Sequence, residues 1–176
     1  MEKYSVYWDA ICKIYFLTKH YLILGEEMSD DFDTFLQPIK EHRDAFDHIA
    51  RVYGQDFLDD GVADLEKYQC ENMNKAVGHV YRAFFDAADW LTYICRRKIR
   101  EMLSGKTYKE IVSVYPQYKD LKSRLIEIPE EIAKIREKKD VSDEEGVLIQ
   151  EVETYKNLLD ELLSSYKEIY NVFGES

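Results

Sequence analysis

The chain has 176 residues, of which 45% are hydrophobic and 34% charged. This length and composition exclude a disordered chain and favour a single packed domain over residues 1–176. The formal net charge of -11 disfavours broad binding to nucleic acid, although residues 61–105 hold 7 basic and 6 acidic residues. The 3 cysteines are widely spaced, without a CxxC pair, which disfavours a disulfide framework and a zinc site.

Neither a basic leader with an apolar core nor a run of about 18 apolar residues occurs in the sequence. We therefore expect a cytoplasmic protein that makes no use of a membrane. The sequence also lacks a Gly-rich phosphate loop, an HExxH motif, a GxSxG motif and a pair of ExxH motifs. It therefore gives no support for most common enzyme classes. We expect no bound metal and no cofactor.

Apolar residues at three- and four-residue steps predict helices in the first third of the chain. The first helix is expected over residues 2–24, with Gly25 just past its end. The second is expected from about residue 32 to Tyr53, with Pro38 near its true start. Ile39 and Phe46 belong to the apolar stripe of this second helix, which we expect to face the core.

The clearest seams lie on two later helices. A long helix over residues 62–103 should pack through Met73, Val77, Val80, Phe84, Ala87, Leu91 and Ile94. A helix that starts near Pro116 should be interrupted at Pro129, which is placed as the first residue of a new helix. The last helix follows a capping box at Ser142 and Glu145 and carries Leu148, Val152, Tyr155, Leu159, Leu162, Tyr166, Ile169 and Phe173. The pattern predicts an all-α, antiparallel up-and-down bundle of four to five main helices.

One segment of the second helix, EHRDAFDH at residues 41–48, has a pattern with chemical meaning. Arg43 is followed by the polar Asp44 and precedes His48 by five positions. This resembles the motif of the HEPN superfamily, all-α proteins in which an Arg and a polar residue precede a His by four to six positions. The resemblance implies a HEPN-like bundle that forms a homodimer in which two motif copies meet. It also implies a metal-independent ribonuclease or an RNA- or nucleotide-binding relative, toxin- or defence-related.

In such a ribonuclease Arg43 would stabilise the charge that builds on the phosphorane, and His48 would act as general acid or base. Asp44 or Glu41 would orient these two groups, and a regulatory protein partner could restrain the activity. However, five residues at about 100° each place Arg43 and His48 roughly 140° apart around a helix. The two side chains cannot both point straight into one site.

Arg43 also lies between Ile39 and Phe46, on the apolar stripe. A guanidinium there requires a buried partner, an oligomer interface or a ligand. A simpler interpretation pairs Arg43 with Asp47 and His48 with Asp44, both at helical spacing, as structural ion pairs.

A second group of candidate residues lies on the long helix. His79 and Arg82 could line a groove shared with the second helix, and Arg96, Arg97 and Arg100 form the densest positive patch of the chain. We consider these side chains candidate contacts to RNA phosphates. The alternative interpretation is a solvent-exposed face, on which the cations near the C-terminal end of the helix complement the helix dipole.

The alternative function is a non-enzymatic interaction protein, in which the heptad seams and the acidic surface serve assembly with itself or with a basic partner. The surroundings of Arg43 and His48 distinguish these two functions. In a ribonuclease, Arg43 and His48 should approach the same cleft, whereas in an interaction protein each should end in a local carboxylate pair.

Overall fold

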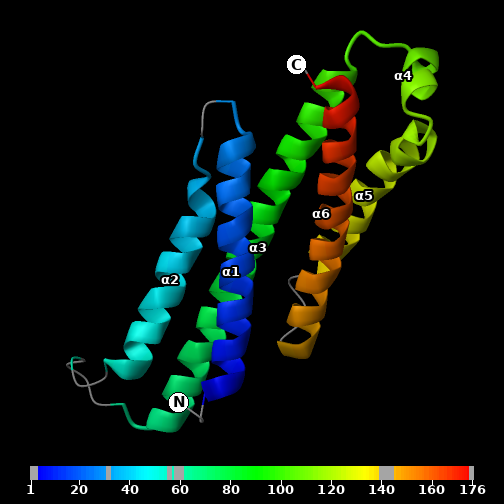
Figure 1. Ribbon diagram of the computed structural model, residues 1–176. Helices are drawn as coiled ribbons and strands as arrows, with labels where there is room; N and C mark the ends of the chain where they lie inside the picture. Colours follow the sequence, from blue (N-terminus) through cyan, green and yellow to red (C-terminus); the bar gives the residue numbers. More distant parts are fainter. Residues whose placement is uncertain (1–3, 31–32, 55–56, 58–61, 139–144, 175–176) are drawn as a thin grey trace. The chain divides into compact units, whose positions relative to one another are not determined.

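The computed structural model describes residues 4–30, 33–54, 57, 62–138 and 145–174 (Figure 1). These residues form helices and no strand, which confirms the all-α class. In chain order the helices are α1 (Ser5–Met28), α2 (Leu36–Tyr53), α3 (Leu65–Leu103), α4 (Tyr108–Val114), α5 (Tyr118–Lys138) and α6 (Glu145–Phe173). Among the described residues, no helix combines the length and the apolar character that crossing a membrane requires.

The chain divides into two compact units, residues 1–89 and 90–176, with the boundary inside α3. The first unit holds α1, α2 and the first part of α3, and the second holds the rest of α3 with α4, α5 and α6. A single domain over the whole chain stays a prediction.

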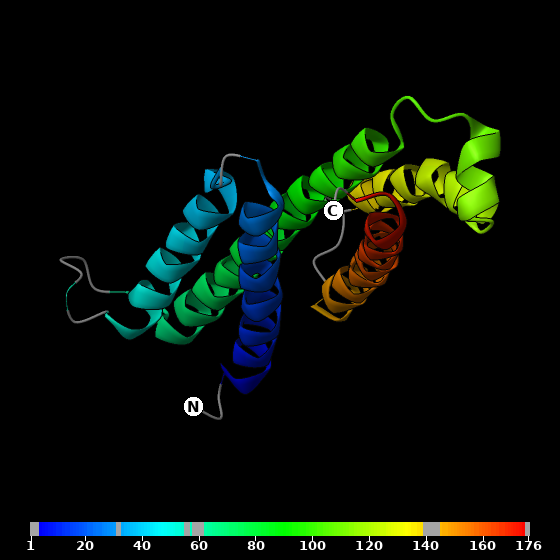
Figure 2. The same cartoon turned by 45° about the horizontal axis from the view of Figure 1, so that its top comes forward.

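In the first unit, α1 and α2 lie side by side and run antiparallel (Figures 1 and 2). Near one end the Trp8 indole N–H donates to the Tyr53 hydroxyl at 3.2 Å, and further along the Tyr15 ring lies 4.9 Å from the His42 ring. The Tyr4 hydroxyl donates to Gln69 of α3 at 2.6 Å. The three segments therefore alternate in direction, as expected for an up-and-down bundle.

The core of both units follows the two predicted seams. Every seam residue of α3, from Met73 to Ile94, is at most 3% exposed. On α6, Val152, Tyr155, Leu159, Leu162 and Ile169 are buried as well. The α3 seam and these α6 positions are confirmed, because the heptad spacing keeps one face of each long helix turned towards its neighbours. Tyr166 and Phe173 of the predicted α6 seam are only half-buried. Ser142, part of the predicted capping box before α6, lies outside the described residues.

Polar contacts fix the helices of the second unit to one another. Thr107 and Glu110 form a capping box at the start of α4, with the Thr107 hydroxyl accepting from the Glu110 amide. The Arg124 guanidinium of α5 donates to both carboxylate oxygens of Glu161 on α6, at 2.7 and 2.9 Å. The Tyr115 hydroxyl donates to Glu168 of α6.

Two predicted helix boundaries are wrong. Gly25 does not end the first helix but is buried inside α1, which runs on to Met28. Pro129 does not begin a new helix but lies inside α5. Its neighbours Ile128 and Ile132 are buried. Tertiary packing of these side chains outweighs the local preference for a break, which costs about 1 kcal/mol for Gly and about 3 kcal/mol for Pro.

The prediction that the apolar stripe of the second helix faces the core is also wrong. Leu36, Ile39, Phe46 and Tyr53 are 46–69% exposed. The face of α2 that is buried instead holds Pro38, Ala45 and Val52, at seven-residue spacing. These residues are small, and they mark the line along which α2 meets its neighbours. Pro38 is tolerated because it lies in the first turn, where a backbone N–H has no partner within the helix.

Candidate functional site

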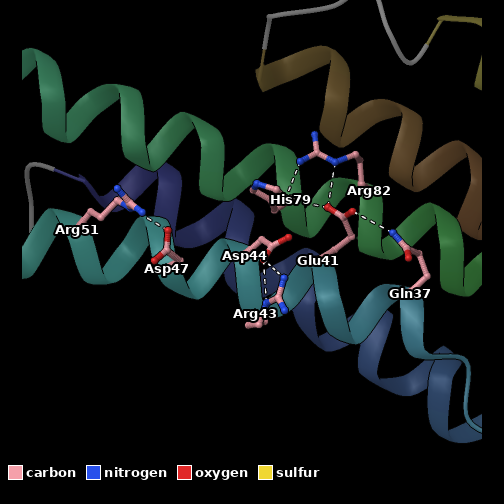
Figure 3. A network of polar contacts seen from close by, with 8 residues as sticks. All are labelled: Gln37, Glu41, Arg43, Asp44, Asp47, Arg51, His79 and Arg82. Carbon is pink, nitrogen blue, oxygen red and sulfur yellow. Dashed lines mark hydrogen bonds and ion pairs between the residues drawn. The ribbon is translucent and has the colours of Figure 1, made fainter.

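A polar cluster lies where α2 faces α3 in the first unit. The Glu41 carboxylate of α2 lies 2.8 Å from His79 Nδ1 and accepts from Arg82 Nε at 3.0 Å, both on α3. Gln37, one turn earlier, donates to the other oxygen of the same carboxylate. Figure 3 shows Glu41 pointing from α2 towards His79 and Arg82. His79 and Arg82 therefore meet the second helix, as the sequence suggested.

His48 extends this cluster along the same interface. Its Nδ1 lies 2.9 Å from the Asn72 side-chain oxygen, and the Asn72 amide nitrogen donates to the Tyr68 carbonyl at 2.8 Å. Because the Asn72 side-chain oxygen only accepts, His48 donates to it from Nδ1. The His48 ring stacks on the His79 ring, with centroids 5.2 Å apart.

The hydrogen-bond partner of His79 depends on whether its Nδ1 carries a proton. Its Nδ1 lies 2.8 Å from a Glu41 oxygen and 2.7 Å from Arg82 Nη2. With a proton on Nδ1 the ring donates to Glu41, and without one it accepts from Arg82, which stays charged.

Burial and charge act against each other at Glu41, whose side chain is 13% exposed. Burial alone would raise the pKa of this carboxyl group, but the hydrogen bonds from His79 and Arg82 outweigh burial and lower the pKa. The carboxylate is therefore ionised near neutral pH. It compensates the Arg82 charge and joins α2 to α3.

Arg43 lies apart from this cluster. The Arg43 side chain is 70% exposed and donates to the neighbouring Asp44 carboxylate from Nε and Nη2, at 2.9 and 2.7 Å. This hydrogen bond lowers the pKa of Asp44. Figure 3 shows Arg43 on the side of α2 that is turned away from α3. Arg43 and His48 thus point to different sides of α2, as the spacing of five residues indicated.

The simpler pairing expected for this segment is wrong in its details. Asp47 accepts from Arg51 at 2.8 Å rather than from Arg43, and His48 contacts Asn72 rather than Asp44. Arg43 does end in a local carboxylate pair, but His48 contributes to an interhelical network.

The predicted phosphate contacts of the last part of α3 lie in the second unit. Arg96 and Arg100 line a surface hollow of about 200 Å³ together with Lys122, Leu125 and Ile126 of α5. Three cations thus surround one hollow, which has two apolar side chains on its wall. Arg97 is not in this lining and pairs with Glu101 at 3.8 Å.

Asn72 and Lys122 belong to these two clusters but were not among the sequence candidates. Asn72 lies two helical turns before His79, on the same face of α3, so the polar stripe of that helix could have been extended to include it. Lys122 had no such signal, because its place beside Arg96 and Arg100 depends on how α5 packs.

Comparisons of the chain with models of protein families, with curated proteins and with solved structures find no significant match. Among the described residues, no group of three or more His, Cys, Asp or Glu side chains is placed to hold a metal ion. What the first cluster offers is two imidazoles that can transfer protons, beside a guanidinium that can bind an anion.

Proposed function

We propose that the chain is a metal-independent ribonuclease of HEPN-like type, in which His48 and His79 transfer protons and Arg82 binds the scissile phosphate. The observation that supports this proposal is the stacking of the two imidazole rings beside Arg82 and Glu41. A pair of imidazoles can supply a base and an acid at neutral pH without a metal. A relative that binds RNA without cutting it would use the same groups.

The proposed reaction is an internal transesterification of RNA. His48 Nε2 takes the proton from a ribose 2′-hydroxyl, whose oxygen forms a bond to phosphorus while the bond from phosphorus to the 5′-oxygen breaks. Protonated His79 gives its proton to the leaving 5′-oxygen. The products are a 2′,3′-cyclic phosphate and a 5′-hydroxyl. Arg82 stabilises the charge that builds on the phosphorane oxygens.

Other residues position these groups or hold the RNA. Asn72 fixes the tautomer of His48, and Glu41 holds His79 and Arg82. Arg43, on the far side of α2, has no part in the chemistry within one chain and serves at most as an outer phosphate contact, and Asp44 holds its guanidinium. Arg96, Arg100 and Lys122 are proposed to bind phosphates further along the RNA.

The test of catalysis is cleavage of a labelled RNA in the presence of a chelator. His48→Ala and His79→Ala should each lower the rate about 100-fold or more, which is the usual contribution of a general acid or base. His20→Ala is the matched control, because His20 is an exposed histidine on α1. Equal cleavage by all four proteins would overturn the assignment.

The test of binding uses the same RNA without turnover. Arg100→Ala and Lys122→Ala should weaken binding and lower the slope of log affinity against log salt by about 1 each. Arg97→Ala is the matched control from the same helix. An unchanged salt slope in the Arg100 and Lys122 variants would remove the hollow from the proposal.

The second candidate function is a non-enzymatic interaction protein. The specific observation in its favour is the row of exposed apolar side chains on the outer face of α2. If neither cleavage nor RNA binding is found, this function remains, and its test is self-association.

A further inference from the structure

The outer face of α2 has the repeat of a helix–helix seam. Its residues follow one another at three- and four-residue steps: Leu36, Ile39, Arg43, Phe46, Ala50 and Tyr53. All six are exposed. In a coiled coil this spacing keeps one line of residues turned towards a partner helix along its whole length. The α2 seam has the same spacing as the buried α3 seam, but its side chains are exposed.

The uncovered surface continues from α2 onto α1. The Trp8 ring of α1 stacks on the Tyr53 ring, with centroids 6.5 Å apart, and Tyr15 of α1 is also exposed. A seam of 18 residues is about 27 Å long at 1.5 Å per residue. Several large apolar side chains exposed together on one face indicate an interaction site.

We propose that this face binds the same face of a second copy of the chain, with the two α2 helices antiparallel. The inference deepens the second candidate function and does not depend on RNA chemistry. In the register that covers the whole seam, Leu36 lies opposite the partner's Tyr53, and Ile39 lies opposite the partner's Ala50. Arg43 then lies opposite the partner's Phe46, and a two-fold axis repeats each contact.

Charge selects the antiparallel orientation. In a parallel pair, Arg43 would lie against the partner's Arg43, and two like charges would share one apolar layer. In the antiparallel pair, the Arg43 guanidinium lies on the partner's Phe46 ring, a favourable cation–π geometry. Within each chain the guanidinium can keep its hydrogen bonds to Asp44.

The edges of the seam are complementary in the same register. Lys40 borders the first half of the seam, and Asp47, which accepts from Arg51 of its own chain, borders the second half. The antiparallel arrangement therefore brings Lys40 near the partner's Asp47 on both sides of the axis. The edge of the seam thus carries a cation and an anion, placed so that each lies near the opposite charge of an antiparallel second copy. This self-complementarity identifies a second copy, rather than a uniformly basic partner, as the occupant.

The first experiment measures the mass of the full chain in solution over a dilution series. The wild type should reach twice the monomer mass of 20.9 kDa. Phe46→Glu should raise the dissociation constant at least about tenfold, since it places a carboxylate in the central layers. Val114→Glu is the matched control, because Val114 is a similarly exposed apolar residue on α4. Circular dichroism verifies that both variants fold.

The second experiment tests the register in a Cys12→Ser, Cys70→Ser background, which leaves the buried Cys95, whose pKa burial raises to about 12. Chains with Ile39→Cys and chains with Ala50→Cys are mixed and treated with a short thiol cross-linker. The mixture should give a cross-linked dimer, whereas Ile39→Cys chains alone should not. A charge exchange serves as a further check: Lys40→Glu and Asp47→Lys should each weaken the dimer, and the double variant should restore it.

Three results would overturn the inference. The wild type could be monomeric at every concentration, or the dimer could be equally stable in Phe46→Glu and in the wild type. Efficient cross-linking of Ile39→Cys chains to one another would show a parallel pair and contradict the proposed register. None of these results depends on whether the protein cleaves RNA.

Discussion

The α3 seam and the outer face of α2 have the same kind of sequence pattern and opposite surroundings. Apolar residues recur on both at three- and four-residue steps. The α3 residues are at most 3% exposed, whereas the four large apolar residues of the α2 face are 46–69% exposed. Periodicity identifies a face that can pack, but it does not say whether the chain itself covers that face.

The inner face of α2 explains why its outer face is left uncovered. Small residues, Ala45 and Val52, are buried along the line where α2 meets its neighbours, and Glu41 and His48 add polar contacts to α3. The helix is therefore fixed by the burial of these side chains and by hydrogen bonds. Its larger apolar side chains remain free to meet another surface.

The largest effect is expected in the α3 seam. Phe84 is fully buried and its ring packs 5.8 Å from Tyr21 and 5.3 Å from Phe85. Phe84→Ala should lower the free energy of unfolding by about 3–5 kcal/mol, because it removes apolar contacts and leaves a cavity. Urea unfolding followed by circular dichroism measures this change. A loss below about 1 kcal/mol would mean that the seam is not the core.

A smaller effect is expected on the inner face of α2. Glu41→Gln should cost about 1–2 kcal/mol at neutral pH, because it removes the charge that His79 and Arg82 contact. The pKa of Glu41 is lowered in the fold, so its contribution is present above the ordinary carboxyl pKa and is lost as the pH falls through the lowered value. Unfolding curves of wild type and variant should therefore converge in acid. A constant difference down to the lowest pH would contradict the ionised pair.

The smallest effect is expected on the outer face of α2. Phe46→Ala should change the free energy of unfolding by no more than about 0.5 kcal/mol when it is measured at high dilution, because Phe46 is 69% exposed. The same substitution should weaken self-association. A loss of several kcal/mol in the dilute protein would show that the chain covers Phe46 itself.

Much of the fold could be predicted from the sequence, because the long seams of α3 and α6 repeat over many turns. Single residues were less informative. Gly25 and Pro129 are helix-breaking in isolation, yet both lie inside helices whose flanking residues are buried. Their local preferences are worth a few kcal/mol at most and are outweighed by packing.

The candidate site could be predicted only in part. The sequence identified His48, His79 and Arg82, and their separate helical stripes allowed them to meet. It assigned Arg43 to the same site because the motif places the two residues close in sequence, but the helix turns Arg43 to the opposite side. The contact between His48 and Asn72, and the place of Lys122, depend on helix packing that no local pattern contains.

The most direct test of this account is the reactivity of a thiol placed on each face of α2, in the Cys12→Ser, Cys70→Ser background. Ala45→Cys on the inner face should be protected from a maleimide at every protein concentration. Ala50→Cys on the outer face keeps the large apolar side chains of the seam, so it should react fully in dilute protein and become protected as the concentration rises and the dimer forms. Protection of Ala50→Cys at all dilutions, or full reactivity at all concentrations, would contradict the claim that α2 presents an uncovered seam to a second copy of the chain.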